Sequence, residues 1–128
     1  MVKIGDTFQL ANRNINDHLF VIISDPSQNP NQIVTANFTK WKADKDQSCI
    51  VDVREHPFIK VRSCVYYRED RLITLEQYEK LLRSCDLVPN EPVREDLLKR
   101  ILEGAAISPH LSFGSREILV NQGLIDTY

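Results

Sequence analysis

Two residues with complementary chemistry flank the first pair of apolar segments in the chain. His18 opens the segment HLFVIIS, and Thr39 closes the segment QIVTANFT. An imidazole, with an ordinary pKa of about 6.5, can take or give a proton near neutral pH, and a threonine hydroxyl can donate to a phosphoryl oxygen. These groups suit a metal-independent cleavage of RNA by its own 2′-hydroxyl. They equally suit plain β-structure, with His18 as the polar start of one strand and Thr39 as the β-branched end of the next.

Positive charge for such a site is available further along the chain. Arg62 completes a predicted catalytic set with His18 and Thr39, and Lys60 is a second source of charge toward a phosphate. Cations that follow a phosphate backbone and aromatic rings that stack on bases are typical of single-stranded RNA binding. The predicted RNA-binding residues are Lys40, Trp41, Lys60, Tyr66 and Arg68. The alternative is a solvated strand face whose charges discourage edge pairing, with Trp41 in the core.

Other chemistries have weaker support in the sequence. His56 precedes a proline in REHPFI, which stiffens the turn, and His110 has no neighbours that complete a site. Cys49 and His56 lack two further ligands at zinc-finger spacing, and four isolated glycines build no phosphate-binding loop. We therefore expect no metal and no cofactor. The three cysteines form no CxxC pair and are expected to be buried or half-buried free thiols.

The composition indicates a single domain, residues 1–128. Of the 128 residues 42% are hydrophobic, enough to bury a core, and the pI of 5.9 is not that of a strongly basic nucleic-acid binder. No apolar run approaches the roughly 18 residues of a membrane span, and no signal-peptide pattern opens the chain. We expect a cytoplasmic protein without membrane contact.

Hydrophobic patterns predict antiparallel β-structure up to residue 73. The strand candidates are GDTFQL, HLFVIIS, QIVTANFT, SCIVDV and FIKVRSCVYYRE. The residues expected to share the core faces of the last two strands are Cys49, Val51, Val53, Ile59, Val61, Val65 and Tyr67. The loop DPSQNPNQ, rich in turn-forming residues, is expected to be a mobile flap over the cleft.

Helical periodicity begins at Thr74, which forms a capping-box pattern with Gln77 at the start of TLEQYEKLLRSCD. A second helix is expected in NEPVREDLLKRILEGAA, with Pro92 in its first turn and Gly104 at its end. A short third helix is expected over about residues 115–121. The predicted fold class is α+β and mainly β, with a small antiparallel barrel in residues 1–73 and two or three helices in residues 74–128.

The order of these motifs resembles the MazF/PemK family of toxin endoribonucleases over about residues 2–85. Gly5-Asp6 matches the Gly-Asp opening of that family, HLFVIIS resembles its apolar strand, and NFT at 37–39 resembles its Pro-x-Thr. Ser63 falls where family members carry a serine at the start of a core strand. His18 stands at the position of the family's catalytic arginine, and Leu19 at that of its proline.

The resemblance implies an SH3-like barrel that acts on single-stranded RNA as a metal-independent endoribonuclease. It also implies a toxin-antitoxin or phage-defence role, a homodimer, and an antitoxin-like segment that covers the cleft. His18, Thr39 and Arg62 would carry the catalysis.

Two alternatives to an endoribonuclease remain open, and the first follows from the missing arginine. A neutral imidazole stabilises a pentavalent phosphate less well than a permanent cation does. The chain then suits a non-catalytic SH3-like interaction module that binds protein or nucleic acid, with its acidic part from Thr74 onward making the protein contact. A gyrase-binding toxin on the same barrel is the third hypothesis.

Overall fold

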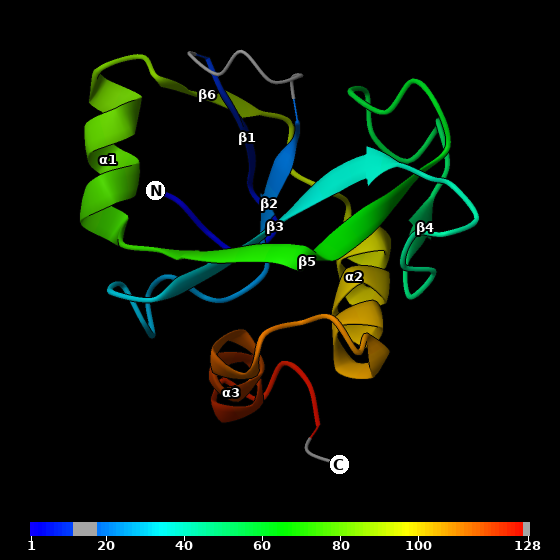
Figure 1. Ribbon diagram of the computed structural model, residues 1–128. Helices are drawn as coiled ribbons and strands as arrows, with labels where there is room; N and C mark the ends of the chain where they lie inside the picture. The colour runs from blue at the N-terminus through cyan, green and yellow to red at the C-terminus, as the bar shows by residue number, and fades with distance from the viewer. Residues whose placement is uncertain (12–17, 127–128) are drawn as a thin grey trace.

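Six antiparallel strands form one curled half-barrel sheet in the computed structural model, which describes residues 1–11 and 18–126 (Figure 1). The strands are β1 (Thr7–Leu10), β2 (Phe20–Ile22), β3 (Ile33–Lys40), β4 (Ile50–Val51), β5 (Ser63–Ile73) and β6 (Leu87–Asn90). They pair in the order β4-β5-β3-β2-β1-β6. The helices are α1 (Leu75–Arg83), α2 (Glu95–Ile107) and α3 (Phe113–Asn121). Within the described residues no helix is long and apolar enough to cross a membrane.

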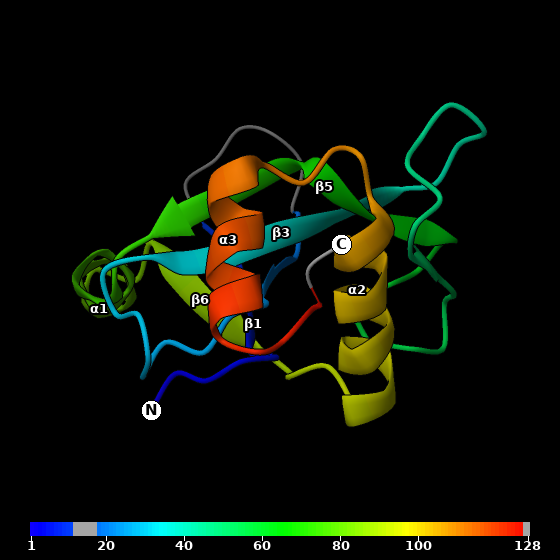
Figure 2. The ribbon, with the colours of Figure 1, turned by 90° about the horizontal axis from the view of Figure 1, so that it is seen from below.

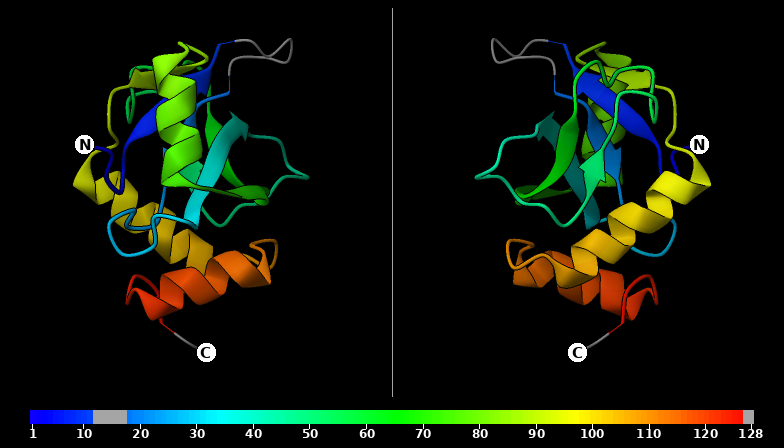
Figure 3. Two further views of the ribbon diagram at one scale, coloured as in Figure 1. Left: turned by 90° about the vertical axis from the view of Figure 1, so that its left-hand side faces the viewer. Right: turned by 90° about the vertical axis from the view of Figure 1, so that its right-hand side faces the viewer.

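Helices cover both faces of the sheet. α2 and α3 lie together against one face, where they form the larger core with side chains of β2, β3 and β5 (Figures 1 and 2). α1 closes a smaller core that contains Phe8, Ile22, Ile33 and Tyr78 (Figure 3). Because β3 is covered on both faces, every residue from Ile33 to Phe38 is buried.

The longest ladder of the sheet joins β3 to β5. It pairs Asn37 with Tyr66, Thr39 with Cys64, and Lys40 with Ser63. The register shifts between Thr35 and Asn37, which leaves extra residues on β5 and bends that strand. This ladder sets the start of β5 beside the end of β3, where the predicted site residues lie.

Tyr67 of β5 links the sheet to α2 by a hydrogen bond. Its side chain is fully buried, and its hydroxyl donates to the Ile101 carbonyl at 2.6 Å. A Cβ atom on Gly104 would stand 2.5 Å from that hydroxyl and 2.8 Å from the Ser48 carbonyl oxygen. The prediction that Gly104 ends the helix is wrong. The glycine lies inside α2 because the helix approaches the sheet too closely there for a side chain.

The predicted start of the first helix is confirmed. The Thr74 hydroxyl accepts from the Gln77 N–H, and the Gln77 side chain accepts from the Thr74 N–H. The third helix begins two residues earlier than predicted, at Phe113. Pro92 is not in the first turn of α2, which begins at Glu95. The Val93 N–H instead donates to the Gly5 carbonyl at 2.9 Å, so this segment stays extended beside the start of the chain.

Strand β6 was not predicted, and it comes from the part of the chain expected to be helical. Its four residues pair with all of β1 at the edge of the sheet, with Pro89 opposite Phe8. A proline is tolerated on an edge strand because its missing N–H can face away from the ladder. The sequence LVPN is too short and too interrupted to signal a strand by itself.

Two valines expected in the core are largely exposed, Val53 at 47% and Val61 at 46%. β4 ends at Val51, and β5 begins only at Ser63. Val53 and Val61 therefore lie outside the strands, and the alternation of buried and exposed side chains along a strand does not apply to them. The other predicted core positions of these segments are buried, namely Cys49, Val51, Ile59, Val65 and Tyr67.

Cys85 is exposed, which contradicts the prediction of a buried or half-buried thiol, whereas Cys49 and Cys64 are buried. Cys85 has φ +64° and follows the end of α1, where its N–H donates to Leu82 and the next N–H donates to Leu81. This is a Schellman ending, in which glycine is usual at the left-handed position. Gly123, with φ +73°, occupies the same place after α3.

We expect Gly104→Ala to lower the free energy of unfolding by about 1–3 kcal/mol, because the new methyl group overpacks against Tyr67 and a backbone oxygen. Gly114→Ala in α3 is the control, since nothing lies within 4 Å of a Cβ there. Urea denaturation followed by circular dichroism measures both. Equal stability of the two variants would contradict the close approach of α2.

We expect Cys85→Gly to stabilise the protein by about 0.5–1 kcal/mol, because glycine adopts the left-handed conformation without strain but loses more entropy on folding. The reciprocal change Gly123→Ala should destabilise by a similar amount. Thermal unfolding of both variants tests the pair, and the same sign of change in both would be inconsistent with the two Schellman endings.

Candidate functional site

A hollow of about 360 Å³ opens where β3 ends. Four parts of the chain line it: the segment just before β2, the end of β3, the connection between β4 and β5, and the start of β5. The lining residues are His18, Phe38, Thr39, Lys40, Phe58, Ile59, Lys60, Val61 and Ser63. The fold thus brings four predicted site residues together, His18, Thr39, Lys40 and Lys60. It adds Phe58, which the sequence did not mark because its position depends on the path of an irregular connection.

The half-buried His18 ring is oriented by the backbone of β3. Its Nδ1 lies 3.3 Å from the Phe38 carbonyl oxygen. A carbonyl oxygen can only accept, so Nδ1 carries the proton in this contact. The neutral ring then has its lone pair on Nε2, which leaves that nitrogen to exchange a proton with a bound group.

Thr39 is brought beside His18 by the pairing of β2 with β3. This ladder pairs Phe20 with Asn37, and the Phe38 N–H extends it by donating to the Leu19 carbonyl at 3.0 Å. One step further in the same register, His18 lies opposite Thr39. Both residues line the same hollow.

Two lysines and a serine complete the polar lining. Lys40 and Lys60 are exposed, and Ser63 is the cross-strand partner of Lys40. The Ser63 hydroxyl donates to the Val61 carbonyl at 2.9 Å, which fixes the start of β5. The ammonium groups of Lys40 and Lys60 and the Thr39 hydroxyl can donate to a phosphate group in this hollow, while His18 Nε2 can accept a proton.

Arg62 lies outside this lining, although it was predicted to act with His18 and Thr39. It is exposed, its Nε stands 3.4 Å from Asp52 Oδ1, and its guanidinium carbon stands 5.3 Å from the centre of the Trp41 ring. The Trp41 N–H donates to the Arg62 carbonyl at 3.0 Å. Trp41 is half-buried, and Lys60 rather than Arg62 supplies charge at the hollow.

Tyr66 and Arg68 lie further along β5 and do not line the hollow. The Lys45 ammonium stands 4.5 Å above the centre of the Tyr66 ring, a cation–π contact. An Arg68 Nη donates to His110 Nδ1 at 3.2 Å. Each of the two predicted RNA-binding residues therefore already has a partner in this structure.

The connection that carries Lys60 is held by two polar side chains. Arg100 of α2 pairs with Glu55 and donates to the Ile50 carbonyl at 2.7 Å; the hydrogen bond from Arg100 lowers the pKa of Glu55. His56 is buried, with Nε2 donating to the Glu91 carbonyl at 2.5 Å and Nδ1 accepting from the Phe58 N–H at 3.0 Å. Both ring nitrogens of His56 are occupied by the backbone, so its contacts position Phe58.

The connection between β3 and β4, which carries Lys45, is anchored by Asp46. The Ser108 hydroxyl donates to its carboxylate at 2.5 Å and the Ser48 N–H at 2.8 Å. Burial alone would raise the pKa of Asp46, but these hydrogen bonds outweigh it and lower the pKa. Ser108 follows α2, so this contact ties the β3–β4 connection to the helical layer.

The loop between β2 and β3 does not cover the hollow as predicted. It joins the Ile33 end of β3, whereas the hollow opens at Thr39, about 20 Å away at roughly 3.3 Å per strand residue. The side chain of Gln122, which follows α3, bonds the loop at Asp25 and Asn29. The loop therefore packs against the end of α3.

Burial raises the pKa of Cys49 and of Cys64 to about 11, so both thiols are protonated at neutral pH. Neither has the thiolate character that nucleophilic catalysis requires. Among residues 1–11 and 18–126, no group of three His, Cys, Asp or Glu side chains is placed to hold a metal ion.

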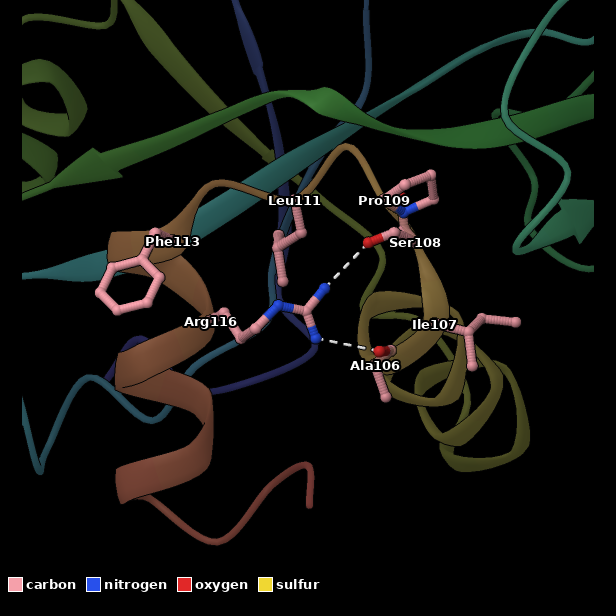
Figure 4. Close-up of a pocket in the computed structure, with 7 residues that line it drawn as sticks. All are labelled: Ala106, Ile107, Ser108, Pro109, Leu111, Phe113 and Arg116. Carbon is pink, nitrogen blue, oxygen red and sulfur yellow. Dashed lines mark hydrogen bonds between the residues drawn. The ribbon is translucent and has the colours of Figure 1, made fainter. Parts of the chain in front are cut away.

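A second hollow, of about 540 Å³, lies between the end of α2 and the start of α3 (Figure 4). Leu111 is buried there, whereas Ile107 and Phe113 are 73% and 80% exposed at its rim. Arg116 donates to the carbonyl oxygens of Ala106 and Ser108, as Figure 4 shows, which satisfies the end of α2. This hollow is mainly apolar and has no predicted site residue.

The sequence matches no protein-family model and no curated protein.

We expect Ser108→Ala to lower stability at neutral pH by about 1–2 kcal/mol, because it removes a hydrogen bond to a carboxylate. The folded-state pKa of Asp46 lies below the ordinary value of about 3.9, so its stabilisation is complete above that value and is lost as the pH falls through the folded pKa. The variant should therefore lose less stability than the parent between about pH 5 and pH 3.

Thermal unfolding across this pH range measures the effect. Ser84→Ala is the control, because its hydroxyl donates to Asp86 in an exposed pair. Parallel pH profiles for the parent and Ser108→Ala would contradict the role given to Asp46.

Proposed function

We propose that this chain is a MazF/PemK-like protein with an SH3-like barrel that cleaves single-stranded RNA without a metal ion. The observation that carries the proposal is the convergence of His18, Thr39, Lys40 and Lys60 on one hollow. The same residues supply a proton acceptor, a hydroxyl donor and positive charge, which are the groups that cleavage by a 2′-hydroxyl requires.

In this mechanism Nε2 of His18 accepts the proton of the attacking 2′-hydroxyl. The bond between O2′ and phosphorus forms as the bond to O5′ breaks, leaving a 2′,3′-cyclic phosphate and a 5′-hydroxyl that takes its proton from water. The hydroxide left by that water takes the proton that His18 accepted, which restores the neutral imidazole. Thr39 donates to a phosphoryl oxygen. Lys60 and Lys40 balance the charge that develops on the phosphate, as compact point charges in place of a planar guanidinium.

We place this activity in a cytoplasmic toxin-antitoxin or phage-defence pair, with the protein acting as a homodimer. An antitoxin-like segment would cover the same hollow. Lys40 and Lys60 are exposed at its rim, so an acidic segment of the partner would fit there by charge.

Incubation of the purified protein with a long single-stranded RNA in EDTA tests the proposal. We expect the parent to yield fragments with 2′,3′-cyclic phosphate ends, and His18→Ala to slow cleavage roughly 100-fold or more through loss of the proton acceptor. Thr39→Val and Lys60→Ala should each reduce the rate.

Two controls are matched to these changes. His110→Ala removes an imidazole outside the hollow, and Arg62→Ala removes a cation that pairs with Asp52. Both should retain most of the parent activity. Intact RNA in every tube, with the parent shown to be folded, would overturn the enzymatic proposal.

A second candidate function is a non-catalytic SH3-like interaction module. It is favoured by the apolar hollow between α2 and α3, where Ile107 and Phe113 are exposed (Figure 4). This candidate predicts that the folded parent leaves RNA intact, so the cleavage assay separates the two functions.

A further inference from the structure

The hollow at the end of β3 has apolar side chains in its lining as well as charged ones. The apolar members are Phe38, Phe58, Ile59 and Val61. Phe38 and Ile59 are buried, whereas Phe58 is half-buried and Val61 is exposed. Phe58 therefore offers part of an aromatic ring to a ligand in the hollow, and the proposed cleavage mechanism gives this ring no role.

The fold holds Phe58 in place through its side chain and its backbone. Its side chain packs against the larger core. Its N–H donates to Nδ1 of the buried His56 at 3.0 Å, and Nε2 of His56 donates to the Glu91 carbonyl at 2.5 Å. Pro57, between the two residues, further restricts the backbone. Because the ring is already ordered, a ligand that stacks on it loses little affinity to ordering the side chain.

A nucleotide joins a flat ring to an anionic phosphate, and the lining has a counterpart for each part. The ammonium groups of Lys40 and Lys60 suit the phosphate. The ring of Phe58 suits the base, since every nucleobase has a π-face that stacks on an aromatic side chain. The volume of about 360 Å³ is near the lower end of the range of ligand sites, roughly 300–1,000 Å³, which suits one nucleotide rather than several.

Stacking rather than hydrogen bonding would hold the base in this hollow. The Ser63 hydroxyl donates to the Val61 carbonyl, and His18 Nδ1 donates to the Phe38 carbonyl. The other polar groups of the lining are those that the proposed mechanism directs at the phosphate. A subsite of this kind accepts any base, because it contacts the face of the base and not its edge.

We infer that Phe58 is the stacking platform of a single-nucleotide subsite, where it holds a base of single-stranded RNA next to the phosphate that Lys40 and Lys60 bind. This inference rests on the proposed action on single-stranded RNA and specifies which side chain holds a base beside the reacting phosphate.

Isothermal titration calorimetry with three short ligands tests the subsite. The first is a bare backbone of abasic deoxyribose phosphates, the second is the same backbone with one central 2′-O-methyladenosine, and the third is a fully 2′-O-methylated oligoadenosine. None of them has a free 2′-hydroxyl, so none is cleaved. We expect the parent to bind the backbone with one adenine roughly tenfold more tightly than the bare backbone, the gain typical of one base stacked on an aromatic ring.

Phe58→Leu should reduce this gain to less than about threefold, because leucine keeps the apolar packing but has no flat ring. Its affinity for the bare backbone should stay the same, since the lysines bind the phosphates. A purely structural role of Phe58 would instead weaken the binding of both ligands alike. Phe58→Tyr keeps a ring and should keep the gain. Phe20→Leu is the matched control, because Phe20 is also half-buried but stacks on Phe8, outside the hollow.

Circular dichroism must show that each variant folds. If Phe58→Leu does not fold, NMR of the parent with labelled phenylalanine decides the question, and the spectrum of Phe58→Tyr assigns the Phe58 signals. We expect the backbone with one adenine to shift the ring protons of Phe58 upfield, and the bare backbone to leave them in place.

The outcomes separate this inference from the proposed function. Equal affinity of the parent for the bare backbone and the backbone with one adenine would overturn the subsite and leave RNA binding intact. Absence of binding to all three ligands by the folded parent would overturn both. A tenfold gain that survives in Phe58→Leu, or Phe58 ring protons that do not respond to the adenine, would overturn the role of Phe58.

Discussion

The pairing of β3 with β5 is the constraint on which the rest of the structure depends. This ladder sets Lys40 beside Ser63, Thr39 beside Cys64, and Asn37 beside Tyr66. A shift of one residue would exchange the two faces of β3 and turn Phe38 out of the core. The larger core contacts the Val34, Ala36 and Phe38 face of β3. Such a slip would turn the polar side chains of Thr35 and Asn37 toward that core, and so the register is strongly specified.

The helices hold this ladder through a few polar contacts at its edges. Tyr67 reaches from β5 to the backbone of α2, and Gly104 lets the two elements approach. Asp46 ties the β3–β4 connection to Ser108, and Arg100 ties the connection before β5 to α2 through Glu55. These contacts position the segments that carry Lys45 and Lys60, so the helical layer contributes to the hollow without lining it.

The two hollows described above differ in the charge and polarity of the side chains that line them. The hollow at the end of β3 contains the imidazole of His18 and two exposed lysines, and the Phe38 carbonyl sets which ring nitrogen is free. The hollow between α2 and α3 is lined mainly by apolar side chains, and its arginine is committed to the end of α2. The first hollow therefore offers positive charge, and the second exposes apolar side chains at its rim.

The sequence by itself determined the features that depend on contacts between residues close together in the chain. Hydrogen bonds or alternation within one segment account for the capping box at Thr74, the strand Ile33–Lys40, and the burial of Val65 and Tyr67. Features that depend on contacts between residues far apart in the chain were decided only by the tertiary structure. Gly104 lies inside α2 rather than at its end. The segment LVPN forms an edge strand because it pairs with β1, and the Arg62 guanidinium lies over the Trp41 ring instead of at the hollow. His18 and Thr39 line one hollow for the same reason, because strand register is a property of the whole sheet and no single segment encodes it.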